Sequence, residues 1–139
     1  MQTEFVIETR GAGLTEFTRD VARWLAGAGD GLVTLMVRHT SASLLIQENA
    51  DPDVQTDLLA WLDRLVPAAD HPSMAYLRHT CEGPDDMPAH IKAALLPVSL
   101  QIPVAGGRMR LGTWQGIYLV EHRRAPHRRR VAALFQTTG

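Results

Sequence analysis

The sequence predicts an α+β fold in one compact domain, with a largely antiparallel or mixed β-sheet, two main helices and a short third helix. The chain has 139 residues, the size of one domain, and 45% of them are hydrophobic, which is enough for a buried core. Segments with the composition of strands outnumber segments with helical periodicity. No linker, change of composition or internal repeat divides the chain, so we expect a single domain over residues 1–139.

The first third of the chain is predicted to contain a strand, a helix and a second strand. Residues 4–9 are rich in β-forming side chains, and the glycines that follow interrupt them. Thr15 is the expected N-cap of a helix whose apolar side chains recur at helical intervals. These side chains are Phe17, Val21, Trp24, Leu25 and Ala28. Residues 32–37 are mostly apolar, which predicts a strand covered on both faces.

The middle of the chain is predicted to hold one long helix and one long loop. Residues 44–46 resume an apolar pattern, and a helix is expected after Asp51 because an aspartate cap precedes a proline at the first helical position. Its apolar stripe is expected to pack in the core. The stripe consists of Val54, Leu58, Trp61, Leu62 and Leu65. Residues 68–88 show little periodicity, which predicts a long loop, and residues 89–96 are expected to form the short third helix.

The last third is predicted to consist of strands. Residues 98–104 alternate between apolar and polar side chains, and Pro103 indicates the edge or the end of a strand. The glycine pair at 106–107 is a hairpin-turn signal. Further strands are expected at residues 108–111, 117–120 and 131–135, and the last of them is expected to close the sheet.

Composition and charge exclude several classes of protein. The formal net charge is −1, which argues against a disordered acidic chain and against a generic nucleic-acid binder. Cys81 is the only cysteine, and the first residues lack the pattern of a signal peptide. No apolar run approaches the length of a membrane span, so we expect a cytoplasmic protein without a membrane or nucleic-acid partner. The arginines at 123–124 and 128–130 are interpreted as a solvated face or a subunit contact.

Residues 79–92 form the segment that is richest in side chains able to bind a metal, transfer a proton or pair with a phosphate. They contain two histidines, three carboxylates, a cysteine and the only lysine of the chain around a Gly-Pro pair, which predicts a loop. His79 and His90 are too far apart for a zinc-helix pattern and converge only if the loop folds back. The alternative is a solvated surface loop in which Asp86 caps a short helix. Two further polar clusters are expected, at residues 39–43 and at residues 112–116 with 121–123.

These clusters are compatible with a metal site and with a phosphate site. Imidazole nitrogens would bind a metal with carboxylates around them, whereas Lys92, Arg123 and backbone amides near glycines would bind phosphate. No P-loop, dinucleotide fingerprint or Cys-x-x-Cys motif is present. Ser41 or Ser43 as a triad nucleophile would lack the usual G-x-S-x-G context. Trp114 lies between glycines, so its ring is expected either to stack on a flat heterocycle or to fill the core or a subunit interface.

Several of these segments together resemble the YjbQ-like (UPF0047) family over nearly the whole chain. The matching segments are His39-Thr-Ser-Ala-Ser-Leu44, Glu48-Asn49, Asp51-Pro52, His79, Glu82-Gly-Pro-Asp-Asp-Met-Pro-Ala-His90, Gly112-Thr-Trp-Gln-Gly116 and Glu121. The resemblance implies a small α+β protein that assembles as a homotrimer and acts as a secondary thiamine-phosphate synthase. Such an enzyme joins hydroxymethylpyrimidine diphosphate to a thiazole phosphate and releases diphosphate. We expect this activity to be weak and assisted by a divalent metal, zinc or magnesium.

The clusters and the resemblance together select the candidate site residues. The candidate catalytic residues are Glu48, Glu82, Asp85, Asp86 and Lys92; the candidate metal ligands are His39, His79 and His90; the candidate substrate-binding residues are Thr40, Ser41, Trp114, Gln115, Glu121 and Arg123. The expected partners are a phosphorylated small molecule and further copies of the same chain. Two alternatives remain open at this point: a non-enzymatic trimeric protein that binds a metabolite or a metal, and a metal-dependent hydrolase.

Overall fold

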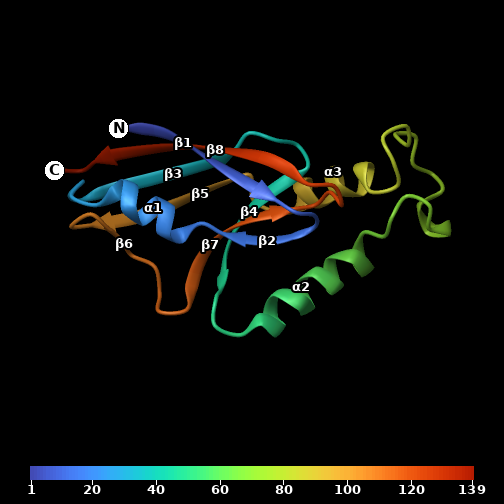
Figure 1. Cartoon of the computed structure of the whole chain (residues 1–139), viewed down its shortest axis with the longest axis horizontal. Coiled ribbons are helices and arrows are strands. Elements are labelled where there is room, and N and C mark those ends of the chain that lie inside the picture. The colour runs from blue at the N-terminus through green and yellow to red at the C-terminus, as the bar shows by residue number, and fades with distance from the viewer.

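Two antiparallel β-sheets form the body of the protein (Figure 1). The computed structural model describes all residues, 1–139. One sheet has five strands in the order β1 (Gln2–Thr9), β8 (His127–Thr137), β3 (Gly31–Val37), β5 (Ser99–Ala105) and β6 (Arg108–Met109). The other has three strands in the order β2 (Gly13–Glu16), β7 (Gln115–Glu121) and β4 (Ala42–Glu48). Every strand pairing is antiparallel, so the α+β prediction is confirmed and the mixed-sheet alternative is not.

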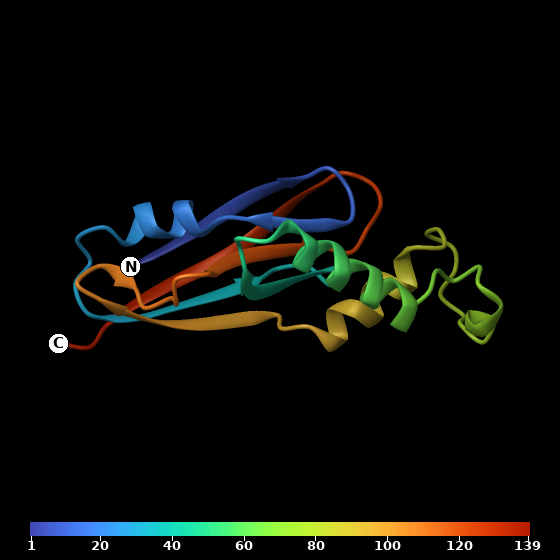
Figure 2. The same ribbon diagram turned by 90° about the horizontal axis from the view of Figure 1, so that it is seen from below.

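Three helices accompany the sheets. They are α1 (Thr18–Leu25), α2 (Pro52–Leu65) and α3 (Asp86–Leu95), and a single 3₁₀ turn spans Pro72–Met74. Helices α2 and α3 lie at one end of the sheets and the loop between them projects beyond that end, whereas α1 lies toward the other end (Figure 2). None of the helices is both long and apolar enough to span a membrane. The predicted short third helix is longer than expected: α3 has 10 residues and α1 has eight.

The core lies between the two sheets and against α1. Val21 and Leu25 of α1 are fully buried, as are Leu35 of β3 and Leu44 of β4. The helical face predicted for α1 is therefore confirmed at its centre. Trp24 extends the same face at the margin of the core, where its ring meets Phe5 edge to face with the centroids 6.0 Å apart.

Two predictions about burial are wrong. Strand β3 is covered on one face only, because Val33, Leu35 and Val37 are buried while Met36 points outward and is 47% exposed. In α2 only Leu62 of the predicted apolar stripe is fully buried, and Trp61 is 59% exposed. Both differences have the same cause. The outer face of the five-stranded sheet and most of α2 have no partner within one chain.

The start of α1 differs from the prediction, and the start of α2 confirms it. Thr15 pairs with Leu119 in the sheet, because residues 13–16 form β2 instead of a helix cap. Helix α1 begins at Thr18, whose hydroxyl donates to Glu16 and accepts from the backbone N–H of Ile117. Asp51 caps α2 as expected, since its Oδ1 accepts from the backbone N–H of Asp53 at 2.9 Å.

The end of the molecule that carries α3 brings together residues that lie far apart in the sequence. Strand β7 runs between β2 and β4 and leads directly into residues 122–124. The segment that enters β4, residues 38–41, lies at the same end, because Ala42 is paired with Glu121. Helix α3 packs on β4. The loop cluster therefore meets residues 39–43 and residues 121–123 at one end of the sheets, whereas residues 112–116 lie at the other end of β7.

Candidate functional site

The candidate site is centred on Asp86, whose side chain is 3% exposed in the first turn of α3. Its Oδ2 lies 2.6 Å from Nε2 of His79 and 3.2 Å from Nε2 of His90. Its Oδ1 lies 2.6 Å from Nη1 of Arg123. His90 comes from the next turn of α3, whereas His79 comes from the preceding loop, which folds back over the start of the helix. Gly83 allows this return, because its φ of +99° lies in the region that favours glycine.

The two histidines are held with their Nε2 atoms facing Asp86. Nδ1 of His90 donates to the backbone oxygen of Thr40 at 3.0 Å, which leaves a lone pair on Nε2 when the ring is neutral. This lone pair faces the carboxylate oxygen of Asp86, and the two repel each other unless a proton or another cation lies between them. The ligand atoms of His79, Asp86 and His90 all lie within 4.8 Å of one another, so a single ion can contact all three.

The surroundings of the two aspartates keep them ionised. Burial alone would raise the pKa of Asp86, but the hydrogen bond from His79 and the charges of Arg123 and His90 lower it overall. Burial likewise acts to raise the pKa of Asp85, but hydrogen bonds from the backbone N–H of Arg124 and from the guanidinium of Arg123 outweigh it. Both side chains therefore carry negative charge at neutral pH.

Arg123 connects these carboxylates to the end of β7. Its Nε donates to Asp85 at 3.0 Å, its Nη1 donates to Asp86 and its Nη2 donates to the backbone oxygen of Glu82 at 3.2 Å. The hydrogen bond to Asp85 raises the pKa of Arg123. All three nitrogens are engaged, so Arg123 orients the aspartates and is not free to bind substrate as the sequence predicted. The carboxylate of Glu82 remains solvent-exposed, 3.6 Å from His79.

The donor set of this cluster fits a divalent metal ion. Two imidazole nitrogens and one carboxylate oxygen are typical of sites for zinc and related ions that keep a position open. At metal–ligand bonds of about 2.1 Å, neighbouring ligands in a tetrahedral site lie roughly 3.4 Å apart. The 3.2 Å between Asp86 and His90 is close to that value, and the 2.6 Å between Asp86 and His79 requires a small outward movement of the exposed ring. Thr40 and Arg123 already orient two of the three ligands from outside, as outer partners do in metal sites.

Glu121 and Ser41, predicted to bind substrate, lie in a second, buried polar network. Arg129 donates to both carboxylate oxygens of Glu121 and to Oγ of Ser41 at 2.9 Å. Thr9 also donates to Glu121, at 2.7 Å. Burial alone would raise the pKa of Glu121, but Arg129, Thr9 and the N–H of Arg123 lower it overall. The prediction that residues 128–130 form a solvated face or a subunit contact is therefore wrong for Arg129, which is buried and paired within the chain.

His39 and Glu48 are not brought into the Asp86 cluster. Nε2 of His39 accepts from the backbone N–H of Arg130 at 2.8 Å, and burial lowers the pKa of this imidazole. Oε2 of Glu48 accepts from the backbone N–H of Asp51 at 2.9 Å, at the turn into α2. Both side chains accept hydrogen bonds from nearby backbone N–H groups and do not face the other candidate ligands.

Trp114 and Gln115 lie at the opposite end of β7 from the cluster. The nine residues from Trp114 to Arg123 rise about 3.3 Å each in a strand, which separates them by roughly 25–30 Å. Trp114 is 62% exposed, so its ring does not fill the core of the chain. Oε1 of Gln115 accepts from the backbone N–H of Gly112 at 2.7 Å within the turn.

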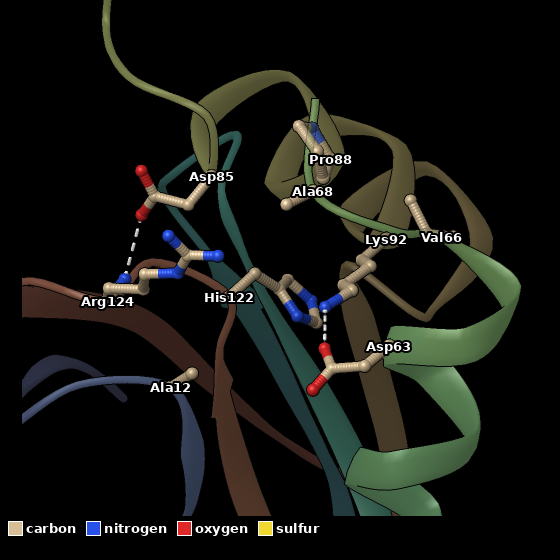
Figure 3. A pocket seen from close by; sticks show the side chains of 9 residues that line it. All are labelled: Ala12, Asp63, Val66, Ala68, Asp85, Pro88, Lys92, His122 and Arg124. Carbon is tan, nitrogen blue, oxygen red and sulfur yellow. Dashed lines mark hydrogen bonds and ion pairs between the residues drawn. The ribbon is translucent and has the colours of Figure 1, made fainter. Parts of the chain in front are cut away.

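A cavity of about 260 Å³ lies beside the cluster (Figure 3). It is lined by Ala12, Asp63, Val66, Ala68, Asp85, Pro88, Lys92, His122 and Arg124. Lys92 was predicted to be functional, and it lies 2.6 Å from Asp63 of α2. His122, Arg124 and Asp63 were missed as site residues. His122 lies between Glu121 and Arg123, and Arg124 follows them, so the same sequence motif could have indicated both. Nothing in the sequence around Asp63 indicates a site residue.

Comparisons with known proteins agree with this fold and these motifs. The family model for UPF0047 protein YjbQ-like matches residues 3–138. A UPF0047 protein of Synechocystis sp. is 51% identical over 132 residues, covering 94% of this chain and 87% of its own length. The UPF0047 protein YjbQ of Salmonella typhimurium is 44% identical over 123 residues, covering 88% of this chain and 86% of its own length.

Solved structures are similar over almost the full length. A conserved hypothetical protein of Thermus thermophilus superposes with a TM-score of 0.84 at 36% identity, covering 96% of this chain and 99% of the other. An uncharacterized conserved protein of the YjbQ/UPF0047 family from Clostridium acetobutylicum gives a TM-score of 0.83 at 34% identity, with coverage of 96% and 99%. The sequence motifs, the fold and these similarities together establish that the chain belongs to the UPF0047 (YjbQ-like) family.

Proposed function

We propose that this protein binds a divalent metal ion through His79, Asp86 and His90 and uses it to act on a diphosphate substrate. The observation that carries the proposal is the convergence of these three side chains on one point. They come from a loop and from two turns of α3, and outside partners orient two of them. Such an arrangement supports a metal-ligand set over a merely solvated loop.

The reaction that we propose is the thiamine-phosphate synthase reaction that the family resemblance implies. In this reaction the thiazole nitrogen forms a bond to the methylene carbon of hydroxymethylpyrimidine diphosphate. The bond from that carbon to the diphosphate oxygen breaks, and its electron pair leaves with diphosphate. A divalent ion would supply the positive charge that stabilises the departing group. Arg123 holds both aspartates in place, and Glu82, exposed beside His79, is the carboxylate that is free to exchange a proton with substrate.

We also propose that the protein assembles as a homotrimer with its sites near the subunit boundaries. Apolar side chains on α2 and on the outer face of the five-stranded sheet support an assembly, because they lack partners within one chain. Trp114 cannot reach the Asp86 cluster of its own chain, so it can stack on a pyrimidine there only from a neighbouring subunit. The single cysteine, Cys81, is an exposed free thiol, which favours a role in the reducing cytoplasm.

Metal content tests the ligand set. Protein incubated with zinc and then dialysed is expected to retain one ion per chain, measured by elemental analysis. Asp86→Asn, His79→Ala and His90→Ala are expected to lose it, and Arg123→Gln to weaken binding about 10- to 100-fold. His39→Ala and His71→Ala serve as matched controls, because both histidines lie outside the cluster. Retention of wild-type stoichiometry by folded His79→Ala and His90→Ala proteins would show that the assignment is wrong.

Turnover separates the enzyme from its alternatives. Metal-loaded protein is incubated with hydroxymethylpyrimidine diphosphate and thiazole phosphate, and thiamine phosphate and diphosphate are measured together. An enzyme forms both in equal amounts, and Asp86→Asn forms neither. A metal-dependent hydrolase releases phosphate or diphosphate without thiamine phosphate. A pure binding protein saturates with ligand and forms no product, and that result contradicts the proposed reaction.

A further inference from the structure

We propose that the cavity between α2, α3 and the segment after β7 binds a phosphate group through Lys92, Arg124 and His122 (Figure 3). The cavity adjoins the metal cluster, because Asp85 lines it and the next residue, Asp86, holds the two histidines. Assigning the bound phosphate to a substrate rests on the proposed function. The binding of phosphate itself does not.

Arg124 is the first reason for this proposal. Its backbone N–H donates to Asp85 at 2.8 Å, but its guanidinium makes no hydrogen bond or ion pair within the chain, in contrast to that of Arg123. Figure 3 shows the side chain extending along the cavity toward His122. A free guanidinium at the wall of a cavity can bind two oxygens of a phosphate at once.

Lys92 is the second reason. Its side chain is only 12% exposed, and its single counter-ion is Asp63, whose side chain is 73% exposed. An ion pair with so exposed a partner contributes little stability, because water screens it. A phosphate monoester carries a charge of about −1.5 to −2 at neutral pH and is therefore the stronger partner. Asp63 can turn into solvent when the anion enters.

His122 is the third reason, because its ring presents a donor to the cavity. The ring is buried, and Nε2 lies 2.8 Å from Oγ of Ser43. Ser43 is fully buried and its hydroxyl has no other partner, so donation to Nε2 is the arrangement that satisfies the hydroxyl, and the proton of the neutral ring then lies on Nδ1. No buried side-chain nitrogen in the chain lacks a hydrogen-bond partner. Nδ1 makes no hydrogen bond, so it must be accessible, and the accessible space beside it is the cavity.

The size and the remaining charges of the cavity suit an anion. Its volume of about 260 Å³ is several times the roughly 30 Å³ that one water molecule occupies in the liquid, so a tetrahedral anion has room. Of its two carboxylates, Asp85 already accepts from Arg123 and from the N–H of Arg124, which compensates its charge. Asp63 is the only competing anion, and its side chain is exposed.

The test measures binding of inorganic phosphate by calorimetry with a chelator present, so that no metal contributes. Wild-type protein is expected to bind phosphate, and Arg124→Gln to bind it about tenfold or more weakly, as expected for loss of a charged hydrogen bond. Asp63→Asn is expected to bind phosphate more tightly, because it removes the competing carboxylate. Arg110→Gln, which alters an exposed arginine elsewhere, is the matched control and should bind like the wild type. Diphosphate as a second probe tells whether the cavity prefers the leaving group or a monoester.

Two results would overturn the proposal. The first is equal phosphate affinity in the wild type and in folded Arg124→Gln. The second is an Asp63→Asn protein that is less stable but binds phosphate with unchanged affinity. The Lys92–Asp63 ion pair would then serve only to hold α3 against α2. Metal content, measured on the same proteins, separates this proposal from the proposed function. Arg124→Gln should keep its metal and lose phosphate, whereas Asp86→Asn should lose its metal and keep phosphate.

Discussion

Arg123 and Arg124 are neighbours with the same side chain, yet the structure places them in different environments. Arg123 turns toward α3 and uses all three guanidinium nitrogens on Asp85, Asp86 and the backbone of Glu82. Arg124 turns into the cavity and leaves its guanidinium without a partner. The paired guanidinium of Arg123 holds the two aspartates, whereas the unpaired guanidinium of Arg124 is available to the proposed anion. The direction in which each side chain points at the end of β7 decides which arginine pairs with the aspartates and which one faces the cavity.

His122 is the single side chain whose protonation should most affect stability. Burial lowers its pKa from 6.5 to about 4, and the positive charges of Lys92 and Arg129 act in the same direction, while Glu121 opposes them. The folded state therefore favours the neutral imidazole. Between pH 6.5 and pH 4 His122 is protonated in the unfolded chain but neutral in the folded chain, so the free energy of unfolding falls as the pH drops. Below pH 4 His122 is protonated in both states and the effect levels off.

We expect the free energy of unfolding to fall by about 2 kcal/mol between pH 7 and pH 5 because of His122. Urea unfolding at both pH values measures it. In His122→Gln, whose amide oxygen can still accept from Ser43, most of this difference should disappear. His39, whose pKa burial also lowers, leaves a smaller dependence of the same sign. The exposed His71→Gln variant is the control, and an equal loss in wild type and His122→Gln would contradict the assignment.

Helix α3 contributes side chains both to the proposed metal cluster and to the proposed phosphate cavity. Asp86 and His90 are four residues apart and lie on one side of the helix. Asp85, Pro88 and Lys92 are spaced three and four residues apart and line the cavity. A short helix thus contributes side chains to both candidate sites, and the cavity is also lined by Asp63 of α2 and by Val66, the residue that follows α2. The two candidate sites adjoin, because Asp85 lines the cavity and the next residue, Asp86, belongs to the cluster.

The outward-facing apolar side chains bear on how whole chains assemble. Trp61 on α2 and Met36 on the five-stranded sheet are both about half exposed or more. A chain of this size gains stability by covering such surfaces with further copies of itself. Their positions on two different elements are compatible with a closed ring, in which each copy uses both surfaces.

We expect light scattering at micromolar concentration to give three times the chain mass of 15.3 kDa. Trp61→Glu and Met36→Glu place a charge in the surfaces that we expect to be covered, so each should shift the mass toward that of one chain. Thr56→Glu on the exposed side of α2 should leave the mass unchanged. A wild-type mass of one chain, or a full trimer in both charged variants, would contradict this assembly.

Local sequence signals determined much of this protein. The cap at Asp51, the hairpin glycines at 106–107 and the β-rich segments specify elements through interactions a few residues long, and the structure confirms them. Packing in space decided the rest. The convergence of His79 on Asp86, the burial of Arg129 and the exposure of Trp61 depend on contacts between residues distant in the sequence. Composition and periodicity report only which side chains prefer burial or a given backbone, so they could not tell which partner each would meet.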